Sequence, residues 1–134
     1  MRFGILIIIL SFLSCEENSN LTNWLKEDPF FNSQNLFLNE RFPNLVISNN
    51  GTLIATWGSS KVVAKRSTDG GRSWGNEIII SDPGFHGGGT LVDEVTGNIF
   101  VFVEEGHPIS PIQIYMSNDD GQSWKKHDTK INRD

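Results

Sequence analysis

The sequence predicts an all-β fold built from about two four-stranded antiparallel sheets. Short runs rich in valine and isoleucine follow one another at spacings of about 8–12 residues, as successive antiparallel strands do. Residues that form tight turns separate these runs, for example Asn49-Asn50-Gly51. A turn motif also recurs after 50 positions, which suits one four-stranded structural repeat.

Eight runs account for the two predicted sheets. The first set comprises residues 44–48, 52–57, 61–66 and 77–81. The second comprises residues 89–92, 99–103 and 112–117, with a further run starting near Trp124. We expect the second sheet to lack a complete closing strand, because the chain ends soon after Trp124.

The repeated motif reads S-x-D-x-G-x-S-W, and both copies follow a strand. The aspartate can accept hydrogen bonds from its own turn, and the glycine can adopt a positive φ. We therefore predict a structural role for the motif residues, which are Ser67, Asp69, Gly71, Trp74, Ser117, Asp119, Gly121 and Trp124. A period of 50 residues further predicts that each sheet is one blade of a β-propeller.

Residues 1–14 are predicted to be a lipoprotein-type signal peptide. Arg2 precedes an apolar run from Phe3 to Leu13, which is shorter than the roughly 20 residues of a membrane span. The run ends at Cys15, the expected lipidation site, although an ordinary secretory signal with an incidental cysteine is the alternative. Residues 15–39 would then form a polar tether and N-terminal segment. We expect an exported lipoprotein, anchored to a membrane by lipid only, in the periplasm or at the cell surface.

The composition excludes several other classes of protein. The 134 residues carry a formal net charge of −5, which argues against nucleic acid as a partner. A single cysteine excludes a disulfide framework within the chain. Neither HExxH nor paired CxxC spacing occurs, so we expect no metal site and no cofactor.

The repeated turn resembles the Asp-box, or BNR repeat, of sialidases (neuraminidases). Further segments of residues 40–134 resemble that family: Arg41-Phe42-Pro43 resembles its Arg-Ile-Pro motif, and the sequence from Val92 to Phe102 resembles a strand-turn-strand segment. The resemblance implies a partial six-bladed sialidase-like propeller, the N-terminal part of a longer protein. It also implies an exo-α-sialidase-like glycoside hydrolase that releases terminal sialic acids from glycans. Two blades cannot close a ring, so we expect the fragment alone to be inactive.

The resemblance assigns substrate binding to Arg41. In sialidases the arginine of this motif is one of three that bind the sialic-acid carboxylate. A planar guanidinium can form two parallel hydrogen bonds with a carboxylate.

The catalytic groups of the family do not transfer to this chain. The segment 56–61, where a sialidase has its acid-catalyst aspartate, contains no Asp, Glu or Arg. Tyr115 lies in a predicted strand, where packing is the expected role, so it does not replace the family's tyrosine nucleophile. The remaining candidates for acid or base catalysis are His86, Glu105 and His107. Two alternatives therefore stay open: an Asp-box propeller acting on another acidic polysaccharide, and a non-catalytic glycan-binding propeller.

Overall fold

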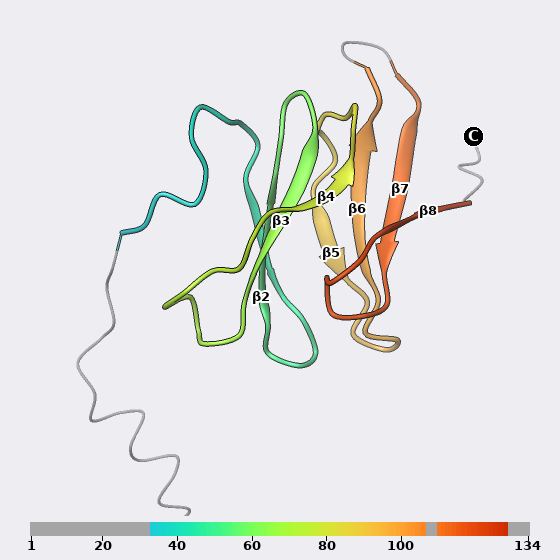
Figure 1. The fold of residues 1–134 in the computed structure, drawn as a ribbon. Coiled ribbons are helices and arrows are strands. Elements are labelled where there is room, and N and C mark those ends of the chain that lie inside the picture. Colours follow the sequence, from blue (N-terminus) through green and yellow to red (C-terminus); the bar gives the residue numbers. More distant parts are fainter. Residues whose placement is uncertain (1–32, 107–109, 129–134) are drawn as a thin grey trace, which may run out of the picture. The chain divides into compact units, whose positions relative to one another are not determined.

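A computed structural model describes residues 33–106 and 110–128 of the chain. The predicted signal peptide with Cys15, most of the predicted tether, and His107 lie outside these residues. The chain divides into residues 1–34 and a compact unit, Asn35–Asp134. In the described part of this unit, eight strands form two four-stranded antiparallel sheets, which confirms the predicted fold class (Figure 1).

Sheet 1 contains the first four strands in sequence order. They are β1 (Asn44–Ile47), β2 (Leu53–Trp57), β3 (Val62–Ser67) and β4 (Ile78–Ser81). The turn between β1 and β2 closes with a hydrogen bond from the Gly51 amide to the Ser48 carbonyl, at 2.8 Å. Gly51 has a φ of 81°, a conformation that glycine adopts without a steric penalty.

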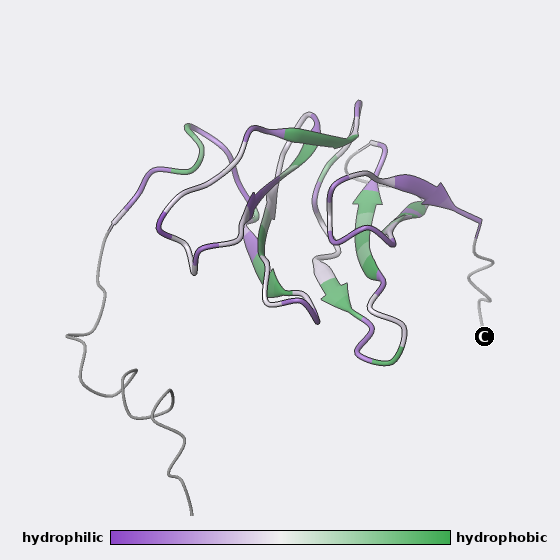
Figure 2. Cartoon of the chain, turned by 60° about the horizontal axis from the view of Figure 1, so that its bottom comes forward, coloured by the Kyte–Doolittle hydropathy of each residue, from purple (hydrophilic) through white to green (hydrophobic). Residues whose placement is uncertain are grey.

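Sheet 2 repeats this order with β5 (Thr90–Val92), β6 (Ile99–Glu104), β7 (Ile112–Ser117) and β8 (Lys125–His127). The expectation that this sheet lacks its closing strand is wrong. Strand β8 pairs with β7, with His127 opposite Ile114 and Lys125 opposite Met116. It contains no apolar residue, and Figure 2 shows it as hydrophilic, so its sequence gave no hydrophobic alternation to recognise.

The core lies between the facing sides of the two sheets. Strand β6 alternates fully buried and half-buried residues, with Ile99, Val101 and Val103 pointing into the core. Sheet 1 contributes Ile54, Val62, Ala64 and Ile80. Each of the buried valine and isoleucine side chains contributes about 1.5–3 kcal/mol when it leaves water, so this contact is the main force holding the sheets together.

The other side of sheet 1 carries a smaller apolar cluster. Trp57 is 1% exposed and stacks on Phe37, with 4.5 Å between ring centroids and 22° between ring planes. The Lys65 ammonium donates to the Leu36 carbonyl at 2.8 Å. Residues 36 and 37, at the end of the predicted N-terminal segment, therefore pack against sheet 1.

Candidate functional site

The two turns with the sequence S-x-D-x-G-x-S-W, which we call Asp-box turns after the motif they resemble, have the same internal hydrogen bonds. In the first, Asp69 accepts from the Ser73 amide at 2.9 Å and from the Ser73 hydroxyl at 2.5 Å. In the second, Asp119 accepts from Ser123 at the same two distances. The side-chain and backbone hydrogen bonds from Ser73 lower the pKa of Asp69, so its carboxylate is ionised and committed to its own turn.

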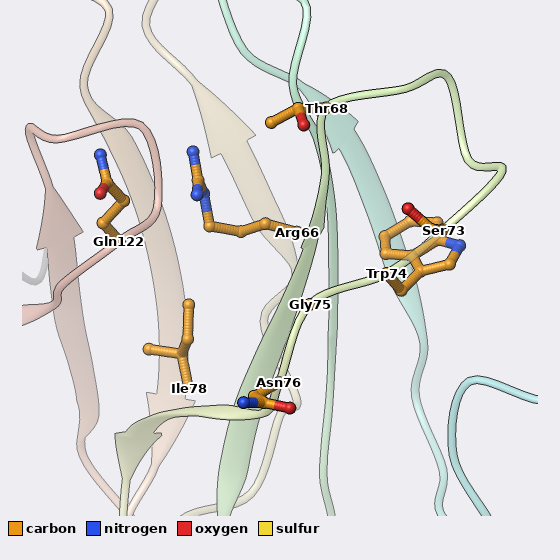
Figure 3. A pocket seen from close by; sticks show the side chains of 8 residues that line it. All are labelled: Arg66, Thr68, Ser73, Trp74, Gly75, Asn76, Ile78 and Gln122. Carbon is orange, nitrogen blue, oxygen red and sulfur yellow. The ribbon is translucent and has the colours of Figure 1, made fainter.

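The larger groove lies beside these turns, at the Asp-box end of the sheets. Its volume is about 540 Å³, and its lining includes Arg66, Asn76, Ile78 and Gln122 (Figure 3). The positive charge of Arg66 is already paired, because its guanidinium contacts Asp120 Oδ2 at 3.0 Å. This groove therefore offers no free cation to an acidic ligand.

A second groove, of about 330 Å³, lies at the opposite end of the sheets. Its lining comes from the entry to β1 and from the loop before β5 and comprises Phe42, Pro43, Asn44, His86, Gly87, Gly88 and Gly89. The register of β1 on β2 pairs Asn44 with Thr56, which places this groove away from the Asp-box ends of β3 and β7 (Figure 1). We call it the entry groove.

Arg41 directly precedes the lining of the entry groove. Its side chain is exposed, and within the described ranges no hydrogen bond or ion pair engages its guanidinium. Its backbone is held, because the Gly58 amide donates to the Arg41 carbonyl at 3.3 Å. The predicted carboxylate-binding residue is thus anchored at its main chain and available at its side chain.

His86 is buried in the wall of the entry groove, with 2% of its surface exposed. Its Nδ1 donates to the Phe42 carbonyl at 2.7 Å, so in the neutral ring Nε2 is the acceptor. Nε2 lies 3.2 Å from the Thr56 hydroxyl and 3.1 Å from the Thr90 hydroxyl. Burial lowers the pKa of His86, and the hydrogen bond to Phe42 opposes that shift. The ring therefore links both sheets to the segment that carries Arg41.

The glycine run after His86 lets its loop lie against sheet 2. Phe85 forms a two-way backbone bridge with Glu104, at 2.8 and 2.9 Å. A Cβ atom at Gly88 would lie 2.3 Å from the Phe102 Cβ, closer than any real contact. Only glycine fits there, and this close approach fixes the position of the neighbouring His86.

The other predicted candidates lie elsewhere. Glu105 is half-exposed and pairs with Lys126 at 2.8 Å. The Tyr115 hydroxyl accepts from Ser81 at 3.0 Å, and its ring packs against the core between the sheets.

Nothing in the described ranges groups three or more metal-binding side chains. In the same ranges there is no helix with the length and apolar character that crossing a membrane requires.

The sequence reasoning missed Glu40. Its carboxylate accepts from the Ser59 amide at 3.1 Å and from the Ser59 hydroxyl at 2.9 Å. Ser59 belongs to the segment 56–61, which has no acidic residue of its own. The Glu40 carboxylate, from another part of the chain, therefore lies at this segment. In the sequence, only the position of Glu40 directly before Arg41 could have pointed to it.

Comparison with known proteins agrees with the predicted resemblance. A sialidase of Micromonospora viridifaciens is 32% identical in an alignment 96 residues long, which covers 59% of this chain and 15% of that protein. The sequence of this chain is therefore similar to part of a sialidase. The chain spans about 15% of the length of that relative. No family model matches it. Among solved structures, the Hadza microbial sialidase Hz136 is 26% identical with a TM-score of 0.49, over 64% of this chain and 25% of that one.

Proposed function

We propose that this sialidase-like chain supplies part of an exo-α-sialidase-type glycoside hydrolase and binds the sialic-acid carboxylate through Arg41. The observation that carries the proposal is the exposed Arg41 guanidinium, unpaired within the described residues, on the residue that directly precedes the lining of the entry groove. A guanidinium of this kind forms two charge-assisted hydrogen bonds with a planar carboxylate. The partner is a glycan ending in sialic acid, and the reaction is hydrolysis of its glycosidic bond.

The proposal includes an exported, lipid-anchored protein. Cys15 would carry the lipid, and the tether would hold the glycan-binding part away from the membrane surface. Incorporation of a radiolabelled fatty acid into the wild-type protein, and its loss in Cys15→Ala, tests this part separately. Unchanged labelling of the variant would reject the anchor.

Hydrolysis of a fluorogenic α-sialoside by the complete gene product tests the activity. We expect Arg41→Ala to raise KM by about 10–100-fold, because the lost charge-assisted pair is worth roughly 1.5–3 kcal/mol. Arg72→Ala, in the Asp-box turn at the opposite end, is the matched control and leaves KM unchanged. An unaltered KM in Arg41→Ala would reject the assignment.

One observation favours a second function, an Asp-box propeller that acts on another acidic polysaccharide. The segment 56–61 has no acidic residue of its own, whereas a sialidase carries its acid catalyst there. Cleavage of a uronic-acid polysaccharide without cleavage of the α-sialoside would select this alternative. Saturable binding of either glycan without cleavage would select a non-catalytic glycan-binding propeller.

A further inference from the structure

The backbone beside Arg41 has an unusual conformation at Phe42. Phe42 has a φ of 60°, in the left-handed region that an aromatic residue rarely occupies. It also precedes Pro43, and proline restricts the conformation of the residue before it. Such a backbone persists only where surrounding contacts hold it.

Three backbone carbonyls are held by the contacts that fix this conformation. His86 Nδ1 donates to the Phe42 carbonyl at 2.7 Å. The Gly58 amide donates to the preceding Arg41 carbonyl at 3.3 Å, and the His86 amide donates to the Gly58 carbonyl at 2.9 Å. These three hydrogen bonds connect three segments of the chain in a ring: Arg41–Phe42, Gly58 and His86. Each segment is bonded to both of the others.

His86 is itself held firmly. Its Nε2 lies within hydrogen-bond distance of the Thr56 hydroxyl on β2 and the Thr90 hydroxyl on β5. These two hydroxyls contact each other at 2.6 Å. The donor that reaches Phe42 is thus fixed by both sheets and is almost fully buried.

We infer that His86 is a positioning residue for Arg41: its Nδ1–H holds the Phe42 carbonyl and so sets the direction in which the Arg41 side chain leaves the backbone. This inference rests on the proposed role of Arg41 in binding sialic acid. A fixed backbone reduces the conformational entropy that Arg41 loses on binding, because the exposed arginine samples fewer arrangements before the ligand arrives. Without the hydrogen bond, the left-handed Phe42 relaxes and the guanidinium loses its approach to the carboxylate.

Two amide substitutions separate this role from simple packing. In His86→Asn, the amide nitrogen replaces Nδ1 and can still donate to Phe42. In His86→Gln, the longer side chain can bring its amide oxygen to the place of the accepting Nε2, so contact with the threonines survives while the bond to Phe42 is lost. Both variants remove the ring, so packing alone predicts similar effects for the two.

The experiment measures the Kd of the complete gene product for N-acetylneuraminic acid by calorimetry, with thermal unfolding recorded for every variant. We expect about a tenfold rise in Kd for His86→Gln, and a near-normal Kd for His86→Asn. The double variant Arg41→Ala with His86→Gln binds no more weakly than Arg41→Ala alone, since His86 acts through Arg41.

The other outcomes overturn the inference in distinguishable ways. If Arg41→Ala weakens binding but His86→Gln does not, the role of His86 falls while the proposed function stands. Equal weakening by His86→Asn and His86→Gln would also reject the positioning role. If Arg41→Ala has no effect, or the wild type does not bind the sugar, the proposed function falls and this inference falls with it.

A second pair of variants serves if His86→Gln does not fold. Phe42→Gly tolerates the positive φ but also samples other backbone conformations, whereas Phe42→Ala loses the ring and keeps the restrictions of an L-residue. We expect weaker binding by the glycine variant than by the alanine variant, with His86 intact in both. Equal affinities would overturn the inference.

Discussion

Asp120 in the second Asp-box turn forms an ion pair with Arg66, the residue directly before the first box, at 3.0 Å. Arg66 Nε also donates to the Asp120 backbone carbonyl at 2.7 Å. The Thr52 hydroxyl donates to the same carboxylate at 2.5 Å. Burial would raise the pKa of Asp120, but hydrogen bonds from Ser48, Thr52 and Arg66 outweigh it, and the pKa is lowered. This contact joins the two sheets at their Asp-box end.

Removing the Asp120 carboxylate should destabilise the joined sheets. We expect Asp120→Ala to lower the free energy of unfolding by about 1–3 kcal/mol, because the half-buried Arg66 and the buried Thr52 lose a shared partner. Asp120→Asn is the control: asparagine tolerates the φ of 63° and keeps an acceptor oxygen, so the loss should be smaller. Urea unfolding measures both, and equal stabilities of the alanine variant and the wild type would contradict this role.

Stability should fall between neutral and mildly acidic pH because of His86. Its pKa is lowered from 6.5 by burial in the folded state, so the unfolded chain binds the proton more readily. The stabilisation is complete above pH 6.5 and is lost as the pH falls from there toward the folded-state pKa. Urea midpoints at pH 7.5 and 5.5 test this, and His86→Asn should show a flatter dependence. An equally steep dependence in that variant would assign the effect to other groups.

Gly88 should not tolerate a side chain. A Cβ atom at this position meets the Phe102 Cβ at 2.3 Å, so Gly88→Ala must push the loop away from β6. We expect a loss of about 1–3 kcal/mol in unfolding free energy. Gly106→Ala is the matched control, since among the described residues, its chain neighbours apart, no heavy atom lies within 4 Å of its added Cβ. Equal unfolding midpoints for the two variants would show that the loop adapts at no cost.

Phe37 should shield Trp57 from solvent. Phe37→Ala removes the ring stacked at 4.5 Å and exposes the indole, which is 1% exposed in the wild type. We expect increased iodide quenching of tryptophan fluorescence and a loss of about 1–3 kcal/mol in stability. Leu38→Ala, at a side chain that is 76% exposed, provides the comparison and should change neither quantity. Wild-type quenching in Phe37→Ala would show that other residues cover Trp57.

Much of the sheet structure could be predicted because its signals are local. A continuous run of β-branched and aromatic residues located β6, and turn residues such as Gly51 marked where a strand had to reverse. The Asp-box turns were equally predictable, since Ser67, Asp69 and Ser73 bond within one short segment. The start of β8 near Trp124 was predicted, but its closure of the sheet was not, because pairing with β7, rather than hydrophobic alternation, defines this strand.

The candidate site depends on contacts between distant segments, which a single sequence does not show. Nothing in the residues around His86 reveals that its ring meets Phe42 and Thr56, 44 and 30 positions away. The left-handed Phe42 contradicts the intrinsic preference of its residue type, and tertiary hydrogen bonds override that preference. Glu40 reaches Ser59 in the same way, across 19 positions. The sequence therefore indicated Arg41 and His86 but not the contacts that join their segments.

The two Asp-box turns have the same internal hydrogen bonds but differ in the residues at the contact between the two sheets. Gly70 occupies in the first turn the place of Asp120 in the second, and Met116 takes the place of Arg66 in the second sheet. Asp120 therefore has no acidic counterpart in the first turn, and Arg66 has no basic counterpart before the second turn. This ion pair therefore specifies the order of the two sheets along the chain. If the two sheets exchanged places, the two charges would no longer meet, although each turn would keep its own hydrogen bonds.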